Sequence, residues 1–192
     1  MINQVALNTV RIVRRSASVR VMGQILLLAV VVCSSTPGRS EAQEGANAAA
    51  LTQLRGLAGE WEGTYLWLGT GTPPEKLSAR YSETGKAAVV ETLIQGGKPS
   101  MTSVYHLDGA DLRLTHFCVM NQPRLKASHI DLAKGILDFD FVDVTNLPSP
   151  NAPHVNGVAL RLLAADHITI TFSVEGGDKS RTEFIDLKRV AK

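Results

Sequence analysis

The sequence predicts an all-β fold, and three observations support this class. Short segments rich in Val, Ile, Thr, Tyr and Phe alternate with turn residues along most of the chain, which is typical of a protein built from β-strands. No convincing helical periodicity follows Gly59. Within the segments, polar and apolar residues alternate, which indicates a sheet with one buried and one solvated face.

The first 42 residues are expected to be a signal peptide. Val21–Cys33 is an uncharged apolar run, too short for a transmembrane helix and suited to the central region of a signal. Ser40–Ala42 offers small residues for cleavage before Gln43. The sequence therefore predicts export to the periplasm or the cell exterior. The basic residues ahead of the apolar run are Arg11, Arg14, Arg15 and Arg20.

Cleavage after Ala42 changes the charge of the chain. It removes five of the 20 Lys and Arg residues and one of the 18 Asp and Glu residues, so the formal net charge falls from +2 to −2. The remaining chain carries no basic run, which argues against a nucleic-acid partner. Cys118 is then the single cysteine and forms no internal disulfide. The length fits a single domain with no membrane span.

The elements follow in order along the chain. Residues 43–53 are expected to be a linker and the start of a short helix over Ala48–Leu57, with Leu51, Leu54 and Leu57 on one face and Gly59 ending it. The proline-rich segment Asp143–Gly157 is expected to be one long loop. The predicted strands are 60–68, 77–84, 87–95, 101–107, 112–119, 125–132, 136–142, 157–163, 167–175 and 181–190.

Turn residues predict how several strands pair. HLDGADL reads as a hairpin that sets Tyr105 opposite Leu114, Ser103 opposite His116 and Met101 opposite Cys118. LAKGI reads as a three-residue loop with Gly135 in the left-handed conformation, which sets His129 opposite Phe139 and Asp131 opposite Leu137. These registers predict one buried face, consisting of Met101, Tyr105, Leu107, Leu112, Leu114, Leu125, Ala127, Leu137, Phe139 and Phe141.

Polar residues share the side of the strands that carries the apolar set. His116, Cys118, His129 and Asp131 have the same parity, so they are expected to point inward. A turn at Asn121–Arg124 would place His116 opposite or diagonal to His129. The sequence therefore predicts a polar cluster inside an apolar enclosure.

The segment LRGLAGEWEGTY (Leu54–Tyr65) resembles the opening of lipocalin-like, or calycin, barrels, with Gly59 and Trp61 as the G-x-W motif. With Gly63 it also resembles the opening of nitrobindin-like haem-binding barrels, although Tyr65 stands where a third glycine belongs. THFCVMNQPR is similar to a segment of a group of uncharacterised exported bacterial proteins. The resemblance implies a single antiparallel lipocalin-like barrel of about 8–10 strands over 54–192, with Trp61 plugging its closed end and a cup that binds a small apolar molecule.

The expected function is non-covalent binding of a small apolar or amphipathic molecule, with no cofactor or metal. Three alternatives stay open: an enzyme, a hydrolase or isomerase, using Cys118 with His116 or His129; a haem or metal site at either histidine; and a barrel filled by its own side chains. The expected ligand-binding residues are Tyr65, Tyr105, His116, Cys118, His129 and Phe139.

Overall fold

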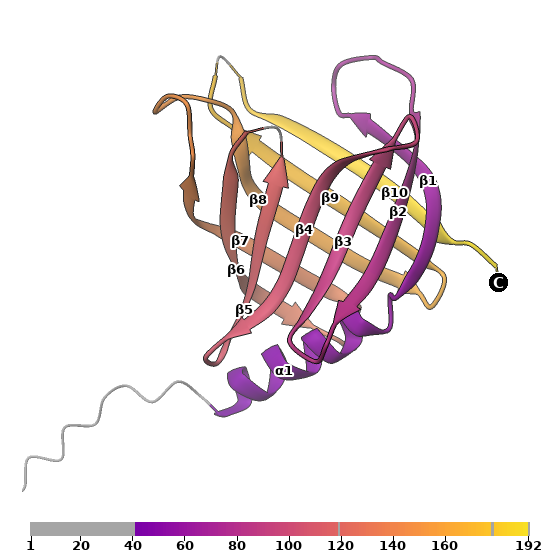
Figure 1. Ribbon diagram of the computed structural model, residues 1–192, viewed down its shortest axis with the longest axis vertical. Helices are drawn as coiled ribbons and strands as arrows, with labels where there is room; N and C mark the ends of the chain where they lie inside the picture. Colours follow the sequence, from indigo (N-terminus) through magenta and orange to yellow (C-terminus); the bar gives the residue numbers. More distant parts are fainter. Residues whose placement is uncertain (1–40, 119, 178, 192) are drawn as a thin grey trace, which may run out of the picture. The chain divides into compact units, whose positions relative to one another are not determined.

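The computed structural model describes residues 41–191 apart from residues 119 and 178, and over them the chain forms one helix and ten antiparallel strands (Figure 1). The all-β prediction is confirmed. The expected signal peptide lies outside the described residues, except for Glu41 and Ala42. The elements are α1 (Glu41–Arg55), β1 (Gly59–Trp67), β2 (Glu75–Thr84), β3 (Ala88–Gln95), β4 (Lys98–Asp108), β5 (Asp111–Cys118), β6 (Gln122–Asp131), β7 (Ile136–Thr145), β8 (His154–Ala164), β9 (His167–Glu175) and β10 (Arg181–Arg189).

The strands close into a barrel with a simple up-and-down order. Each strand pairs with the next one along the chain, and β1 also pairs with β10, which closes the sheet. Closure leaves no unpaired sheet edge. The strand direction therefore defines two ends: β1 begins at the end beside α1, and β10 begins at the opposite end (Figure 1).

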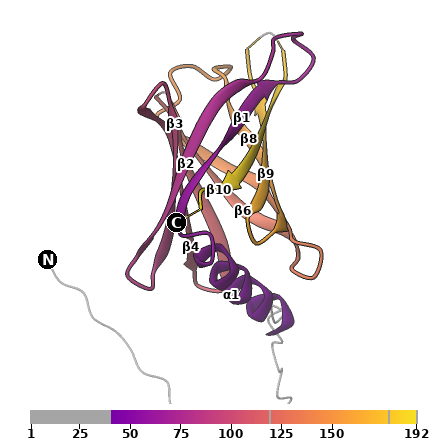
Figure 2. The same ribbon diagram turned by 90° about the vertical axis from the view of Figure 1, so that its right-hand side faces the viewer.

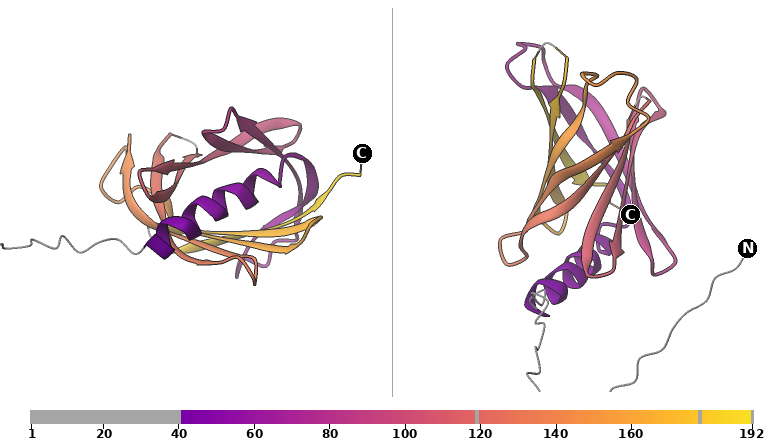
Figure 3. Two further views of the ribbon diagram at one scale, coloured as in Figure 1. Left: turned by 90° about the horizontal axis from the view of Figure 1, so that it is seen from below. Right: turned by 90° about the vertical axis from the view of Figure 1, so that its left-hand side faces the viewer.

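Helix α1 lies across one end of the barrel (Figure 2; Figure 3, left). It packs against β3, β4, β5 and β6 and buries Ala50, Leu51 and Leu54. The Asn47 side chain is also buried and donates a hydrogen bond to the Ala110 carbonyl at 2.7 Å, in the β4–β5 turn. This end of the barrel is closed by apolar packing.

The helix begins earlier than predicted. Residues expected to form a linker belong to α1, which starts at Glu41 and ends at Arg55. Ala and Gln are good helix formers, and Glu41 and Glu44 in the first turn complement the positive end of the helix dipole. Packing of Asn47 and Ala50 against the barrel stabilises the added turns.

Trp61 joins the helix end to both neighbouring strands at the closed end. Its ring is fully buried, and its Nε1 donates to the Leu57 carbonyl at 2.9 Å. The Arg189 guanidinium lies 4.4 Å from the ring centroid and donates to the Gly56 and Ala58 carbonyls at 2.7 and 2.8 Å. Trp61 therefore lies in the core at the closed end, where the sequence placed it.

The predicted β4–β5 register is confirmed, but the registers on both sides of β6 are wrong. Cys118 and Asn121 form an antiparallel bridge, so Asn121 already belongs to the sheet and the predicted turn at Asn121–Arg124 is wrong. Leu114 then pairs with Leu125. A β-bulge between Ala127 and His129 inserts one extra residue, and His129 pairs with Asp138 rather than facing Phe139.

The bulge overturns the prediction that His129 and Asp131 point inward. Ile130 packs against the core, which turns its two neighbours outward. The His129 side chain is 61 % exposed, with Nδ1 at 3.7 Å from Asp138 Oδ2. Asp131 pairs with Lys134 on the surface at 3.0 Å.

The long loop is also shorter than predicted. β7 continues to Thr145 and β8 begins at His154, so the irregular segment covers residues 146–153 only. Gly135 has the predicted left-handed conformation, with φ of 66°. A side chain there would meet the Leu162 carbonyl, so glycine is needed at this turn on two grounds.

Candidate functional site

The barrel is hollowed at the end opposite α1. One cavity of about 350 Å³ lies between β1, β3, β4, β5, β8, β9 and β10, and an adjoining cavity of about 440 Å³ extends beneath the 146–153 loop. They share Trp67, Cys118, Val155 and Val174. We call the two together the mouth cavity, and its volume is in the range of small-molecule sites.

Apolar side chains make most of the mouth cavity. Trp67, Met101, Val155 and Val174 come from four different strands. Strand alternation places three of them on the inner face, and the register shift between Val155 and Gly157 brings Val155 to the same face. The Arg181 guanidinium, which also lines the part of the cavity beneath the loop, lies 5.2 Å from the Trp67 ring centroid. The loop adds Pro148, Ala152 and Pro153.

The 146–153 loop is fastened to the strands around it. Asn121 Nδ2 at the start of β6 donates to the Pro153 carbonyl at 3.0 Å. His154 Nδ1 donates to the Ala152 carbonyl at 3.0 Å, and its ring packs on Phe141 at 5.2 Å between centroids. These contacts hold the loop as a preformed wall of the cavity.

Glu183 is the buried acidic group of the mouth cavity. It lies on β10 with the same inward parity as Ile185 and Leu187 and is 4 % exposed. Across the sheet it is flanked by Trp67 of β1 and Phe172 of β9. Burial raises the pKa of the Glu183 carboxyl to about 7.

Tyr65 and Cys118 reach the same cavity, as do the polar residues Gln95 and Ser100. Tyr65 donates its hydroxyl proton to Glu75 Oε2 at 2.9 Å, and partial burial together with that bond raises the pKa of its phenol. Burial and the negative charge of Glu183 raise the pKa of the Cys118 thiol. A raised pKa leaves little thiolate at neutral pH, so the surroundings of Cys118 disfavour nucleophilic chemistry.

Below the mouth cavity lies a buried hydrogen-bond network centred on Glu91. The Tyr81 and Tyr105 hydroxyls donate to Glu91 Oε2 at 2.6 and 3.1 Å, and Ser103 Oγ donates to Oε1 at 3.0 Å. Burial raises the pKa of the Glu91 carboxyl, and the three hydrogen bonds counteract part of that shift. Burial, with the Glu91 charge, also raises the pKa of both phenols well above 10.

His116 ends this network. Its Nδ1 lies 3.0 Å from Ser103 Oγ. Because Ser103 has one hydroxyl proton and donates it to Glu91, we assign the proton of the second bond to Nδ1. Burial lowers the pKa of His116 to about 4, so the ring is neutral at physiological pH. Nε2 then has a free lone pair, with no hydrogen-bond partner in the described part of the chain.

The six residues predicted to bind a ligand divide into three groups. Tyr65 and Cys118 line the mouth cavity. Tyr105 and His116 belong to the buried network, and Phe139 packs in the core against Tyr105 at 5.7 Å between ring centroids. His129 lies on the outer surface, so it is not part of any interior site.

Sequence reasoning missed the two buried carboxyl groups and Tyr81. Glu91 stands between Val89 and Leu93 on β3, and Glu183 stands two residues before Ile185 on β10. Each shares the parity of the apolar residues in its own strand. The signal in the sequence was therefore a charged residue at a position where strand alternation points the side chain into the barrel.

His116 is buried outside the mouth cavity, so it cannot bind a metal ion or haem held there. Phe172 packs on the His116 ring at 4.8 Å between centroids, and His116 does not line the mouth cavity. Over residues 41–191, apart from 119 and 178, no group of three or more His, Cys, Asp or Glu side chains is placed to hold a metal ion.

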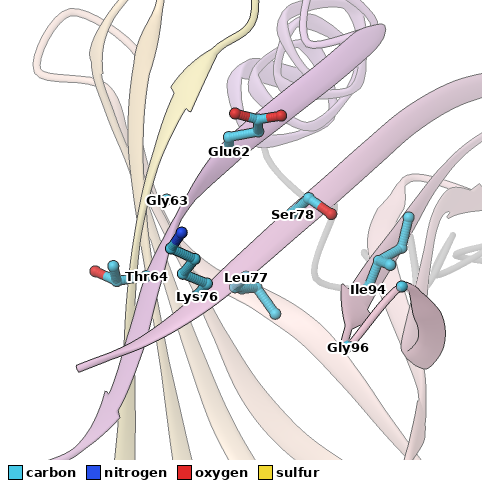
Figure 4. A pocket seen from close by; sticks show the side chains of 9 residues that line it. Glu62, Gly63, Thr64, Lys76, Leu77, Ser78, Ile94 and Gly96 are labelled. Carbon is cyan, nitrogen blue, oxygen red and sulfur yellow. The ribbon is translucent and has the colours of Figure 1, made fainter. Parts of the chain in front are cut away.

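A broader depression of about 670 Å³ lies on the outer face of β1 and β2 (Figure 4). Glu62, Thr64, Lys76 and Ser78 project there from the solvated side of their strands. It is more open and more polar than the mouth cavity. Exposed side chains that can rearrange do not make a preformed site, so the mouth cavity is the better candidate.

No protein-family model matches this chain, and no curated protein matches it. Solved structures that are similar include Rv2717c from M. tuberculosis, with 15 % identity, a TM-score of 0.47 and coverage of 74 % of this chain and 98 % of that one. A DUF3598-family protein of unknown function from Nostoc punctiforme has 13 % identity, a TM-score of 0.40, and coverage of 73 % and 50 %. A redesigned β-barrel has 13 % identity, a TM-score of 0.37, and coverage of 72 % and 95 %. At these values the likeness carries no information on function.

None of the helices within residues 41–191 has the length and apolar character needed to cross a membrane.

Proposed function

We propose that this barrel binds a small amphipathic molecule in its mouth cavity. The observation that carries the proposal is an apolar enclosure, formed by Trp67, Met101, Val155 and Val174, around one buried carboxyl group, Glu183. Apolar walls supply contact area, and a single polar group fixes orientation. The G-x-W opening that resembles lipocalin-like barrels is in keeping with a cup of this kind.

The closed end and the open end have different roles in this proposal. At the closed end, α1 and Trp61 supply stability, and the Glu91 network fills the middle of the barrel with satisfied polar groups. Ligand contact is confined to the end of the barrel opposite α1. Tyr65 and Cys118 keep their predicted contact role, and His116 lies in the buried network, packed on Phe172.

The binding test uses N-phenyl-1-naphthylamine, an uncharged probe whose fluorescence rises in apolar surroundings. The wild-type protein should bind one probe molecule per chain. Val174→Trp fills both parts of the mouth cavity and should abolish binding. Leu163→Trp adds the same ring on the outer face of β8, where Leu163 is exposed, and should bind as the wild type does. Equal binding by the Val174 variant would refute the proposal.

We also propose that the protein is exported by cleavage after Ala42. The buried residues of α1 are Asn47, Ala50, Leu51 and Leu54, all of which follow Ala42. Cleavage there removes two exposed residues of the helix and no core contact. N-terminal sequencing of protein from the cell envelope or medium should begin at or near Gln43, and a protein that retains Met1 would contradict the proposal.

A further inference from the structure

Glu183 has no partner of its own inside the barrel. Within the described residues it has no hydrogen bond and no ion pair, although its side chain is almost fully buried. The other buried acidic group on an inward parity, Glu91, accepts bonds from three hydroxyls. A buried carboxyl without donors is costly, so its retention in an apolar cavity indicates a partner supplied by the ligand.

The chemistry of that partner follows from the charges around the cavity. An ionised carboxyl group only accepts hydrogen bonds. Glu75 places a second carboxylate at the rim, bonded to Tyr65. The Arg181 guanidinium lies 5.2 Å from the Trp67 ring centroid and lines the part of the cavity beneath the loop, whereas among the described residues no Lys, Arg or His side chain lines the part that contains Glu183. An anionic head group would meet like charge here, whereas a cation would gain both the carboxylate and the aromatic faces of Tyr65 and Trp67.

We propose that the ligand of the mouth cavity is an amphipathic amine, a molecule with an apolar chain or ring and a protonated nitrogen that pairs with Glu183. This inference rests on the proposed binding function and names the class of ligand for that same cavity. The nitrogen lies against the Glu183 carboxylate on β10, and the apolar part lies along Met101, Val155 and Val174. Burial of both charges together offsets the desolvation that each would suffer alone.

The proposal implies that binding depends on pH. The pKa of Glu183 is about 7 in the free protein, so a large fraction of the carboxyl is protonated at neutral pH, and an ammonium group binds only the ionised form. The other titratable or charged groups that face the cavity are Tyr65 with Glu75, Cys118, His154 and Arg181. Of these, His154 is replaced in a control variant below, so that its contribution is separated from that of Glu183.

The test compares three ligands of equal chain length, decylamine, decanol and decanoate, as competitors of N-phenyl-1-naphthylamine. At pH 8 decylamine should bind at least about tenfold more tightly than decanol, and decanoate should be the weakest. Between pH 8 and pH 6 the affinity for decylamine should fall about tenfold, as the ionised fraction of Glu183 does. The affinity for decanol should change little.

Glu183→Gln keeps the size of the side chain and removes its charge. This variant should bind decylamine and decanol within about twofold of each other and lose the pH dependence. Glu62→Gln, an exposed carboxylate on the outer face of β1, should behave as the wild type does. His154→Gln should retain the tenfold effect of pH on decylamine affinity. That result would assign the effect to Glu183.

The outcomes separate the two proposals. If the probe binds and Val174→Trp blocks it, but decanol or decanoate competes as well as decylamine in the wild-type protein, the amine inference is overturned and the binding function stands. The ranking of the three ligands is measured on the wild-type chain, so it does not depend on the folding of any variant. If the probe itself fails to bind, both proposals fall.

Discussion

At the scale of single residues, Glu183 makes stability depend on pH. Its pKa is about 7 in the folded barrel and about 4.3 in an unfolded chain. Between these values the unfolded chain releases a proton that the folded chain retains, so the free energy of unfolding falls as pH rises through this window. The stability present below pH 4 should drop by about 4 kcal/mol by pH 8, and Glu183→Gln should abolish that drop in urea denaturation.

His116 acts in the opposite direction and has to be separated from Glu183. Its pKa of about 4 in the folded state lies below the ordinary value near 6.5, so stability present above pH 6.5 is lost as pH falls toward 4. The two slopes partly cancel in the wild-type protein. The difference between wild type and the Glu183 variant, measured at each pH, isolates the Glu183 contribution. A difference that does not vary with pH would contradict the assigned burial.

The Glu91 network should be sensitive to loss of its acceptor. Glu91→Leu leaves the hydroxyls of Tyr81, Tyr105 and Ser103 without their shared partner. Ser103 can still donate to His116 Nδ1, so two donors are left unsatisfied. Each costs about 1–3 kcal/mol, and the variant should lose at least about 2 kcal/mol of unfolding free energy. Glu91→Gln keeps one acceptor oxygen and should lose less. Equal stability of the Leu variant would show that the network adds nothing to the barrel.

At the scale of elements, the strands were predictable but not all their pairings. The ten segments of alternating residues correspond to β1–β10, because period-two alternation follows from backbone geometry. The β4–β5 register was predictable because the Asp-Gly turn fixes it. The β6 registers were not, because the Cys118–Asn121 bridge and a bulge after Ala127 shift the pairing.

The sequence around the bulge does carry a trace of it. Leu125 and Ala127 have one parity, and Ile130 and Leu132 have the other. Both pairs cannot face the core along a regular strand, so one extra residue must lie between them. Reading this conflict would have placed His129 outside the barrel. The Glu91 network could not be predicted from one strand or hairpin, because it joins side chains from β2, β3, β4 and β5.

Gly63 shows how closely β1 approaches β10. A Cβ atom at this position would lie 1.8 Å from the Asp186 carbonyl oxygen, so Gly63→Ala must displace one strand. Loss of stability should be in the upper range for single substitutions, about 3 kcal/mol or more. Gly45→Ala in α1 has open space around its Cβ and should be neutral or stabilising by up to about 1 kcal/mol. Thermal unfolding by circular dichroism compares the two.

At the scale of the whole molecule, the barrel separates stability from binding along its axis. Two tryptophans on β1 mark the two ends: Trp61 is fully buried beside α1, and Trp67 lines the mouth cavity. Trp61→Ala should cost about 3–5 kcal/mol, as expected for a large buried aromatic side chain. Trp67→Ala should cost less and should weaken binding of the naphthylamine probe.

The reverse result, a stable Trp61 variant that no longer binds the probe, would contradict this division of the barrel. Both variants replace a tryptophan of β1 with alanine and remove the same side-chain atoms, so the comparison controls for the chemistry of the change. Melting temperature and probe affinity, measured on the same samples, complete the test.

Native mass spectrometry of the full chain with decylamine at pH 8 tests the central claim most directly. The wild-type protein should retain one amine per chain, and Val174→Trp should retain none, because the new ring occupies the mouth cavity beside Glu183. Leu163→Trp should retain one, as the wild type does. An amine adduct of equal abundance on the Val174 variant, or none on the wild-type chain, would contradict binding in the mouth cavity.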